Sequence, residues 1–501
     1  MATVSTPTRS IEIPDGFRLH TENTSHILLS SDEAFLNPVQ EFNRDTSIAC
    51  IRVWSEELNR TKEERWGMMQ LRKSQKKPKS GKAKSAAEEI STSTSSDVMA
   101  VDPSEKQVVD DSVAERPSTS STNCPAYKPY KFTILEALSA TGLRSIRYAK
   151  EIPLVKYVIA NDLSPAAVEV MKRNILLNGL LEDSSTAEQS ISKAPQGKIQ
   201  VNEGDACTLM YNHREEKKRV DVVDLDPYGT AAPFIDSAVQ AVADGGLLCV
   251  TCTDLSVLAT TNFPEKCFSN YGGVPVKAEY CHEAALRLVL HTISTSAGRY
   301  GRYIEPLLSL SIDFYVRLFI RVHSSPMEVK KALVKNSTFY VCTTCQSYYE
   351  QPFGKMLSKT HEKSGHTNLI FKTRAGPLVT GKCPECESNL HVGGPMWSGP
   401  LHDRDFVGKV LEHIEESESH YGTAARMKET SPARRLLAKE PLVEADFTHH
   451  PESPSALETV KLVRYQDNPK NWGPAKKAAI TKPDLKRKRS AETLEEPPAK
   501  H

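Results

Sequence analysis

The chain has 501 residues, of which 64 are basic and 63 are acidic, so its net charge is +1. This length allows two or three domains with substantial cores, and the near-zero charge means that any nucleic acid would meet only a local basic patch. No apolar run reaches the length of a membrane span, and no signal-peptide core is present at the N-terminus. We therefore expect a soluble intracellular protein without a membrane partner.

The first 72 residues are predicted to fold, whereas residues 73–123 are not. Short apolar runs such as Ile27-Leu28-Leu29 occur in the first segment, and Ser47–Trp54 is expected to form a helix. From Lys73 to Asn123 the composition changes to Ser, Thr, Lys, Glu and Asp with almost no aromatic residues. Such a segment cannot bury enough surface to fold, so we predict a disordered insertion.

Strands and helices then alternate. Strands are expected at 132–138, 157–162, 199–205, 220–226 and 247–253, and helices at 142–150, 165–177, 232–243 and 278–297, followed by an apolar segment at 307–322. Ser164 is the natural N-cap of the second helix. Repeated βα units predict an α/β fold with a doubly wound parallel sheet. We place this domain at 124–323, a smaller α+β domain at 324–465 and a disordered basic tail at 466–501.

The strand at 220–226 ends in Asp226-Pro227-Tyr228-Gly229. Open α/β sheets place their chemistry at the carboxyl ends of strands, where Asp226 is expected to lie. The Asp226 carboxylate and the Pro227 carbonyl can accept the N–H groups of an exocyclic amine, and Tyr228 can stack on its base. An ordinary Asp-Pro turn explains these residues equally well. The residues at the ends of the neighbouring strands are therefore needed to choose between a turn and a catalytic site.

The turn after the first strand favours a nucleoside cofactor. Residues 136–144 contain one glycine, so they lack the Gly-x-Gly-x-x-Gly pattern of a dinucleotide site. Their small side chains still let a ligand such as S-adenosylmethionine approach the backbone. Asp162, after the second strand, can bind ribose hydroxyls, and Asp205 beside Ala206 can accept the adenine amine. Each acid alone is more simply a helix N-cap, but acids at four consecutive strand ends favour a binding crevice.

The 11 cysteines indicate a metal site in a reducing compartment rather than a disulfide framework. Two Cys-x-x-Cys pairs are present: Cys342 with Cys345, and Cys383 with Cys386. The competing zinc set joins the first pair to His361 and His366, whose spacing fits a finger, but it leaves the second pair unexplained. We favour four cysteines on a structural Zn²⁺, where four thiolates leave no open position for catalysis.

Four motifs together resemble the tRNA guanine-N2-dimethyltransferase family, whose members use S-adenosylmethionine to methylate guanosine 26. They are Asn37–Asp45, Ala137–Arg144, Asp224–Gly229 and Gly393–Trp397. The likeness covers roughly residues 11–72 and 124–465, and it misses the insertion and the tail. It implies a class I methyltransferase (Rossmann-like) domain. After one transfer N2 keeps one N–H, so a second methylation is possible if the pocket admits the first methyl group, and the resemblance implies that it does.

The resemblance also assigns roles to residues. It implies catalysis at Asp226 and packing of the N-terminal segment over the cofactor, while Pro227 and Tyr228 are catalytic candidates from the chemistry of the turn. The cofactor-binding positions that it implies are Arg44, Arg144, Asp162, Asp205 and Ala206.

The RNA side and the cellular location carry weaker signals. Basic residues near the cysteine pairs and at Arg434-Arg435 would form a tRNA-binding face with the aromatic residues Tyr340, Tyr348, Tyr349 and Trp397. The cluster Lys482–Arg489 predicts a nuclear localisation signal, which we favour over a role in non-specific RNA affinity. A mitochondrial presequence is only weakly suggested by Arg9 and Arg18, because acidic residues lie among them. No obligate protein partner is evident.

The sequence thus predicts methyl transfer from S-adenosylmethionine to N2 of a tRNA guanine. Two alternatives remain open: an amino-methyltransferase acting on another nucleic acid or on a protein glutamine, and a non-catalytic zinc RNA-binding factor. Identifying the macromolecule that accepts the methyl group distinguishes the first alternative from the predicted function. Failure to bind S-adenosylmethionine would favour the second alternative.

Overall fold

A computed structural model describes residues 13–30, 36, 40–75, 126–180, 198–361, 365, 367–377, 379 and 381–417. The insertion predicted at 73–123 lies outside these ranges except for its first three residues, which end a helix. The expected tail at 466–501, its basic cluster and Arg434-Arg435 also lie outside them. In the described part of the chain, no helix is both long and apolar enough to cross a lipid bilayer.

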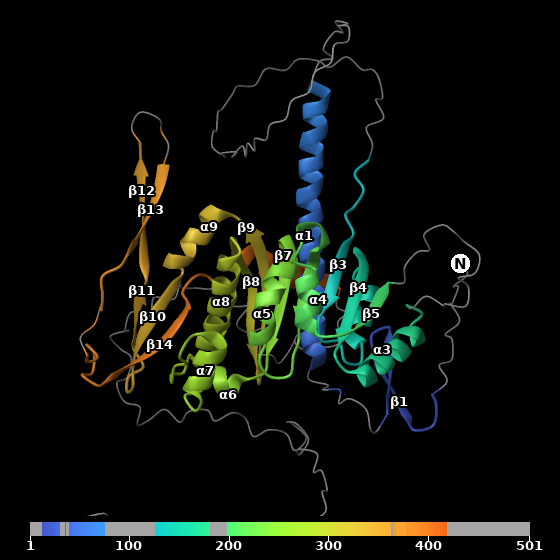
Figure 1. The fold of residues 1–501 in the computed structure, drawn as a ribbon, viewed down its shortest axis with the longest axis horizontal. Helices are drawn as coiled ribbons and strands as arrows, with labels where there is room; N and C mark the ends of the chain where they lie inside the picture. The colour runs from blue at the N-terminus through green and yellow to red at the C-terminus, as the bar shows by residue number, and fades with distance from the viewer. Residues whose placement is uncertain are drawn as a thin grey trace, which may run out of the picture. The chain divides into compact units, whose positions relative to one another are not determined.

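Seven strands form the central sheet in the order β5-β4-β3-β6-β7-β9-β8 (Figure 1). They are β3 (Phe132–Glu136), β4 (Val155–Asp162), β5 (Ile199–Glu203), β6 (Val220–Leu225), β7 (Val242–Cys252), β8 (Arg302–Ile312) and β9 (Tyr315–Ser324). Strands β3 to β7 are parallel, as predicted. The expectation of a wholly parallel sheet is wrong at one edge, because the apolar segment 307–322 folds into the β8–β9 hairpin and β9 runs antiparallel to both neighbours.

Helices cover both faces of this sheet. One face packs against α1 (Gln40–Gln75), α2 (Leu143–Glu151) and α3 (Pro165–Leu177), and the other against α4 (Ala206–Asn212), α5 (Ala232–Ala241) and α8 (Cys281–Arg299). Successive strand residues point to opposite faces, so Val222 joins the first core and Val223 the second. Burial on both faces explains why the strands read as continuous apolar runs. Ser164 caps α3 as predicted, accepting a hydrogen bond from Ala167.

The N-terminal segment forms the hairpin of β1 (Phe17–Glu22) and β2 (Ser25–Ser30), followed by α1. Helix α1 has 36 residues, many more than the eight expected at 47–54. Its buried residue Trp54 meets Phe132 edge to face, with 5.4 Å between ring centroids, and donates to the Gly245 carbonyl at 3.3 Å. These contacts anchor the N-terminal half of α1 on the sheet.

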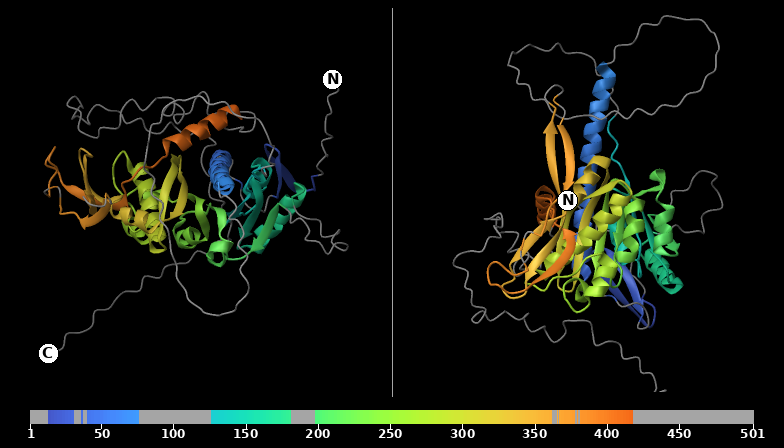
Figure 2. Two further views of the ribbon diagram at one scale, coloured as in Figure 1. Left: turned by 90° about the horizontal axis from the view of Figure 1, so that it is seen from above. Right: turned by 60° about the vertical axis from the view of Figure 1, so that its left-hand side comes forward.

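After β9 come α9 (Pro326–Lys330), the 3-10 helix η3 (Lys331–Val334) and two small antiparallel sheets. The first has the order β11-β10-β14, from β10 (Asn336–Cys342), β11 (Tyr348–Pro352) and β14 (Leu390–Trp397). The second is the hairpin of β12 (Gly354–Thr360) and β13 (Thr367–Thr373), which extends away from the first (Figures 1 and 2). Met396 and Trp397 of β14 join the core around α8, and α10 (Arg404–Glu416) packs its Phe406 into the core around α1.

The Gly393–Trp397 motif is explained by close packing. A Cβ atom at Gly393 would lie 2.2 Å from a Val276 methyl carbon, and Gly394 has a positive φ of 84°. Trp397 is 2% exposed, and its indole N–H donates to the Pro400 carbonyl at 3.0 Å. The expectation that Trp397 belongs to an RNA-binding face is therefore wrong, because this ring is a core residue.

Candidate active site and metal centre

Asp226 follows β6 directly, at the carboxyl edge of the sheet. The turn after it is held in place, since Gly229 donates to the Thr253 hydroxyl at 2.7 Å and accepts from the Thr253 N–H at 2.8 Å. Thr230 is linked to the Tyr271 hydroxyl at 2.7 Å. Tyr228, by contrast, is 87% exposed. A fixed turn that presents an exposed aromatic ring beside a carboxylate suits the binding of a planar base.

The Asp226 carboxylate is paired with Arg144 of α2. The buried Arg144 guanidinium also lies 3.8 Å from a Glu136 oxygen and 3.7 Å from an Asp224 oxygen. Arg144 also contacts α1, where it donates to the Ser47 hydroxyl at 3.2 Å. Arg144 therefore joins two strand ends to the N-terminal helix.

Arg317 of β9 is a second buried cation that the sequence did not reveal. It donates to Asp224 at 2.7 Å, to the Thr251 hydroxyl at 3.0 Å and to the Ser47 hydroxyl at 2.9 Å. The Tyr148 hydroxyl donates to the other Asp224 oxygen at 2.6 Å. The available signal was a single arginine in the apolar strand Tyr315–Ile320, because arginine is rarely buried without a partner.

The charges in this cluster balance at neutral pH. Burial raises the pKa of Glu136 to about 8, against the opposing effects of Arg144 and Ser145, so Glu136 keeps its proton. Burial also acts to raise the pKa of Asp224, but Arg317 and Arg144 outweigh it and the net shift is downward. Two guanidinium groups therefore face the carboxylates of Asp224 and Asp226, which is the pairing that buried charges require.

Arg44, a predicted cofactor residue, lies in a neighbouring cluster. Its Nε donates to Glu22 of β1 at 2.8 Å, and Glu22 also pairs with Arg147 at 3.1 Å. Burial opposes ionisation of Glu22, but hydrogen bonds from His20 and Arg44 and the charge of Arg147 lower its pKa to about 2. The structure thus places Arg44 with Glu22, while the adjacent Asn43 reaches Arg144 at 3.4 Å.

Asp162 is the last residue of β4, and Asp205 follows the end of β5 by two residues, so both lie at the carboxyl edge of the sheet as predicted. Both make local hydrogen bonds. Asp162 accepts from the N–H groups of Ala140 and Ser164, each at 2.9 Å. Asp205 caps α4 by accepting from Thr208 at 2.7 Å, and the buried Ala206 begins that helix. A carboxylate has about four acceptor positions, so each acid retains capacity for a hydroxyl or an amine.

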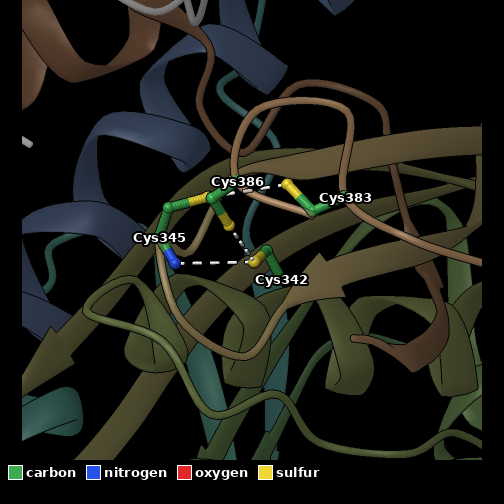
Figure 3. A group of neighbouring side chains, drawn as sticks. All are labelled: Cys342, Cys345, Cys383 and Cys386. Atoms are coloured by element: carbon green, nitrogen blue, oxygen red, sulfur yellow. Dashed lines mark hydrogen bonds between the residues drawn. The ribbon is translucent and has the colours of Figure 1, made fainter. Parts of the chain in front are cut away.

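The four cysteines of the two Cys-x-x-Cys pairs converge, and their sulfur atoms all lie within 4.8 Å of one another (Figure 3). Cys342 and Cys386 are 3.4 Å apart, and Cys345 and Cys383 are 3.6 Å apart. Tetrahedral zinc with Zn–S bonds of about 2.3 Å places its sulfurs about 3.8 Å apart, so this set fits zinc. The competing set is not supported, because His361 is not part of the group and His366 lies outside the described residues.

The sheet and its edge define a class of protein. Numbering the seven strands by their order in the chain gives 3-2-1-4-5-7-6 with the seventh antiparallel, and acids stand at the carboxyl ends of the first four. With no glycine-rich phosphate loop, this is the Rossmann-like fold of class I methyltransferases.

The chain belongs to the N2,N2-dimethylguanosine tRNA methyltransferase family, whose model matches residues 16–439. It is 40% identical over 448 residues to the mitochondrial tRNA (guanine(26)-N(2))-dimethyltransferase of Saccharomyces cerevisiae, covering 88% of this chain and 70% of that protein. The Schizosaccharomyces pombe tRNA (guanine(26)-N(2))-dimethyltransferase is 39% identical, with coverages of 90% and 73%.

A solved structure of Trm1 from Pyrococcus horikoshii with S-adenosyl-L-methionine shares the fold. Its TM-score is 0.53 at 23% identity, covering 81% of this chain and 82% of that one. The family predicted from the four motifs is confirmed.

Proposed function

We propose that this protein transfers methyl groups from S-adenosylmethionine to the exocyclic N2 of guanosine 26 in tRNA, in two successive reactions. The family membership supports the reaction, and both relatives named above are tRNA (guanine(26)-N(2))-dimethyltransferases. The structural observation that carries the proposal is the position of Asp226 at the carboxyl end of β6, beside the exposed ring of Tyr228.

The residues of the turn have distinct roles in this proposal. The Asp226 carboxylate and the Pro227 carbonyl accept the N2–H groups, which aligns the nitrogen lone pair, and Asp226 takes the proton that N2 loses. Tyr228 stacks on the guanine after the base leaves its helix. S-adenosylmethionine, when bound, supplies an electrophilic methyl group. Most of the acceleration then comes from holding two reactants in line.

The cofactor is proposed to lie over the ends of β3, β4 and β5. Asp162 would bind the ribose hydroxyls, and Asp205 would accept the adenine amine beside Ala206. Arg144 and Arg44 are the nearby cations for the carboxylate of the methionine part. Support comes from the strand-end positions of both acids and from the burial of both arginines.

The β12–β13 hairpin is proposed as a tRNA contact. Its strands carry Lys355, Lys359 and Lys372 and no acidic residue, and all three lysines are exposed. Phosphate groups are bound by such clustered cations. The cysteine cluster, with structural zinc, would fix the ends of β10 and β14, from which the C-terminal part of the fold is built.

We propose the nucleus as the location, from the basic cluster Lys482–Arg489, which lies outside the described residues. Because one relative is named as mitochondrial, mitochondria are the second compartment to test. Imaging of the full chain with and without this cluster decides between them.

The reaction is tested by transfer of labelled methyl groups to unmodified tRNA transcripts, followed by nucleoside analysis. N2-methylated and N2,N2-dimethylated guanosine are expected at position 26, and a transcript with adenosine there should accept nothing. Asp226→Ala should abolish transfer while S-adenosylmethionine still binds, whereas Asp405→Ala, at an exposed site in α10, should leave the rate unchanged. Label on a different macromolecule, or none with the cofactor bound, would refute the proposed substrate.

A further inference from the structure

The Tyr315 hydroxyl is buried and has no hydrogen-bond partner among the described residues. Tyr315 is the first residue of β9, and its side chain is 0% exposed. An unpaired buried hydroxyl costs free energy, and native structures contain few of them. Such a group next to a reaction site indicates a partner that arrives with a ligand.

Tyr315 stands at the same edge and on the same face of the sheet as Asp226. Tyr315 and Arg317 are two residues apart in β9, so their side chains share a face. Arg317 binds Asp224, and Asp226 is two residues beyond Asp224 toward the sheet edge. Burial raises the pKa of Tyr315, and the negative charge of Asp226 adds to the rise, which keeps the phenol a neutral donor.

The strand order indicates which ligand meets this hydroxyl. The proposed cofactor residues follow β4 and β5, on one side of β6, whereas β9 lies on the other side, beyond β7. A ligand atom that reaches Tyr315 therefore belongs to the methyl acceptor. The Asp226 side chain is 22% exposed and Tyr315 is fully buried, so an entering base meets Asp226 first and Tyr315 at its inner end.

The chemistry of guanine then identifies the atom. Along one edge guanine presents the N2 amine, the N1–H donor and the O6 acceptor, so a site with Asp226 at the amine still needs a donor for O6. The other buried side chains with donors on this face, Arg144, Arg317 and Tyr148, already bind carboxylates of the cluster. Among the described residues, Nε of Arg317 has no partner of its own, but the same guanidinium is held by Asp224, Thr251 and Ser47. Tyr315 differs from these side chains, because its hydroxyl is its one polar side-chain atom and has no partner among the described residues. Tyr315 also lies two positions nearer the sheet edge than Arg317.

We propose that Tyr315 donates a hydrogen bond to O6 of the target guanine and is a specificity-determining residue of the site. Adenine carries an amine at the corresponding position, so it would place a donor against this donor. This inference rests on the proposed function and extends it from the reaction to recognition of the base.

The test pairs Tyr315→Phe with a substrate change at the same contact. Transcripts carrying guanosine or 6-thioguanosine at position 26 differ in one atom, since sulfur replaces O6. Sulfur is a weak hydrogen-bond acceptor, whereas N1–H and the N2 amine are the same in both bases. With guanosine we expect Tyr315→Phe to lower kcat/KM about tenfold to a hundredfold. With 6-thioguanosine the same variant should change kcat/KM less than about threefold.

Three results would overturn the inference: equal losses on both substrates, no loss on either, or weakened binding of S-adenosylmethionine. Thermal unfolding separates recognition from a structural role, because removing an unpaired hydroxyl should leave Tm unchanged or raise it. Tyr130→Phe is the control. The Tyr130 hydroxyl lies away from the site and already donates a hydrogen bond to Asp221, at a distance of 2.9 Å. Wild-type protein that fails to methylate the guanosine transcript would refute the proposed function instead.

Discussion

Arg144 and Asp226 form an ion pair between helix α2 and the end of β6, although they are 82 residues apart in the chain. Arg144 binds Oδ2 of the carboxylate, so the orientation of Asp226 is fixed before any amine arrives. A general base and amine acceptor must be held in one geometry to act efficiently. For the role proposed for Asp226, we therefore expect Arg144 to affect both stability and turnover.

Arg144→Gln should destabilise the protein by about 3–5 kcal/mol, because it leaves the partly buried carboxylate of Asp226 without its cation and the buried carboxylate of Asp224 with Arg317 alone. Urea unfolding measures this loss, and kcat should fall with it. Arg52→Gln is the matched control: Arg52 forms a surface pair with Glu56 at 3.4 Å, worth less than about 1 kcal/mol. Similar unfolding free energies for the two variants would show that the ion pairs of Arg144 contribute no more to stability than a surface pair.

Stability should fall between about pH 4.5 and pH 8 because of Glu136. Its pKa is about 8 in the folded protein and 4.5 as the reference, so the folded state binds the extra proton. The contribution is complete below pH 4.5 and is lost as the pH rises through 8, amounting to a few kcal/mol by order of magnitude. Glu136→Gln imitates the protonated form and should remove this part of the slope.

The unfolding free energy of both proteins at pH 5, 6, 7 and 8 checks this prediction. The wild-type curve should drop relative to the Glu136→Gln curve as pH increases. Parallel curves would mean that Glu136 is ionised in the folded state. Glu216→Gln, at an exposed residue, controls for the loss of one surface acid.

The cysteine cluster should hold one zinc ion per chain. Cys383→Ser removes a buried ligand and should abolish stoichiometric zinc, as measured by mass spectrometry of the metal, and should lower Tm. Cys281→Ser changes a partly exposed free cysteine of α8 and should do neither. Full zinc content in Cys383→Ser, or none in the wild type, would contradict a four-cysteine site.

The β12–β13 hairpin should contribute to tRNA affinity through charge. Replacing Lys355, Lys359 and Lys372 by Gln should weaken binding and reduce the slope of log Kd against log salt by roughly one for each lost phosphate contact. Methylation at saturating tRNA should change little, because the catalytic turn is untouched.

A control with equal loss of charge uses Lys156, Lys172 and Lys218, which are exposed elsewhere. Binding titrations at several salt concentrations separate the two triple variants. Equal effects would show that total charge, and not the hairpin, sets the affinity.

The sequence predicted those site residues whose positions follow from the strand or turn in which they lie. Asp226, Asp162 and Asp205 were placed at strand ends because a buried parallel strand followed by a turn residue is readable from the sequence. Ser164 was recognised as an N-cap for the same reason. The four cysteines were found from spacing alone, because few other arrangements would use two such pairs.

The remaining features depend on contacts between distant segments. Ser47 lies in a helix whose polar residues look like a solvated face, yet its hydroxyl binds both Arg144 and Arg317. The burial of Trp397 depends on α8, and the antiparallel direction of β9 depends on the tight turn at Asp313, which has a φ of 48°. Neither hydrophobic periodicity nor a sequence motif indicates which distant residues will contact each other in these three cases.

The link between Ser47 and Arg317 spans 270 positions, and this has a consequence for synthesis. A nascent chain exposes Asp224 long before Arg317 has left the ribosome, so the catalytic turn emerges without one of the cations that balance it. The buried charge cluster beside Asp226 is therefore completed only when β9 enters the sheet between β7 and β8. A messenger truncated before β9 would yield a chain with three of the four motifs but without Arg317, the cation that binds Asp224.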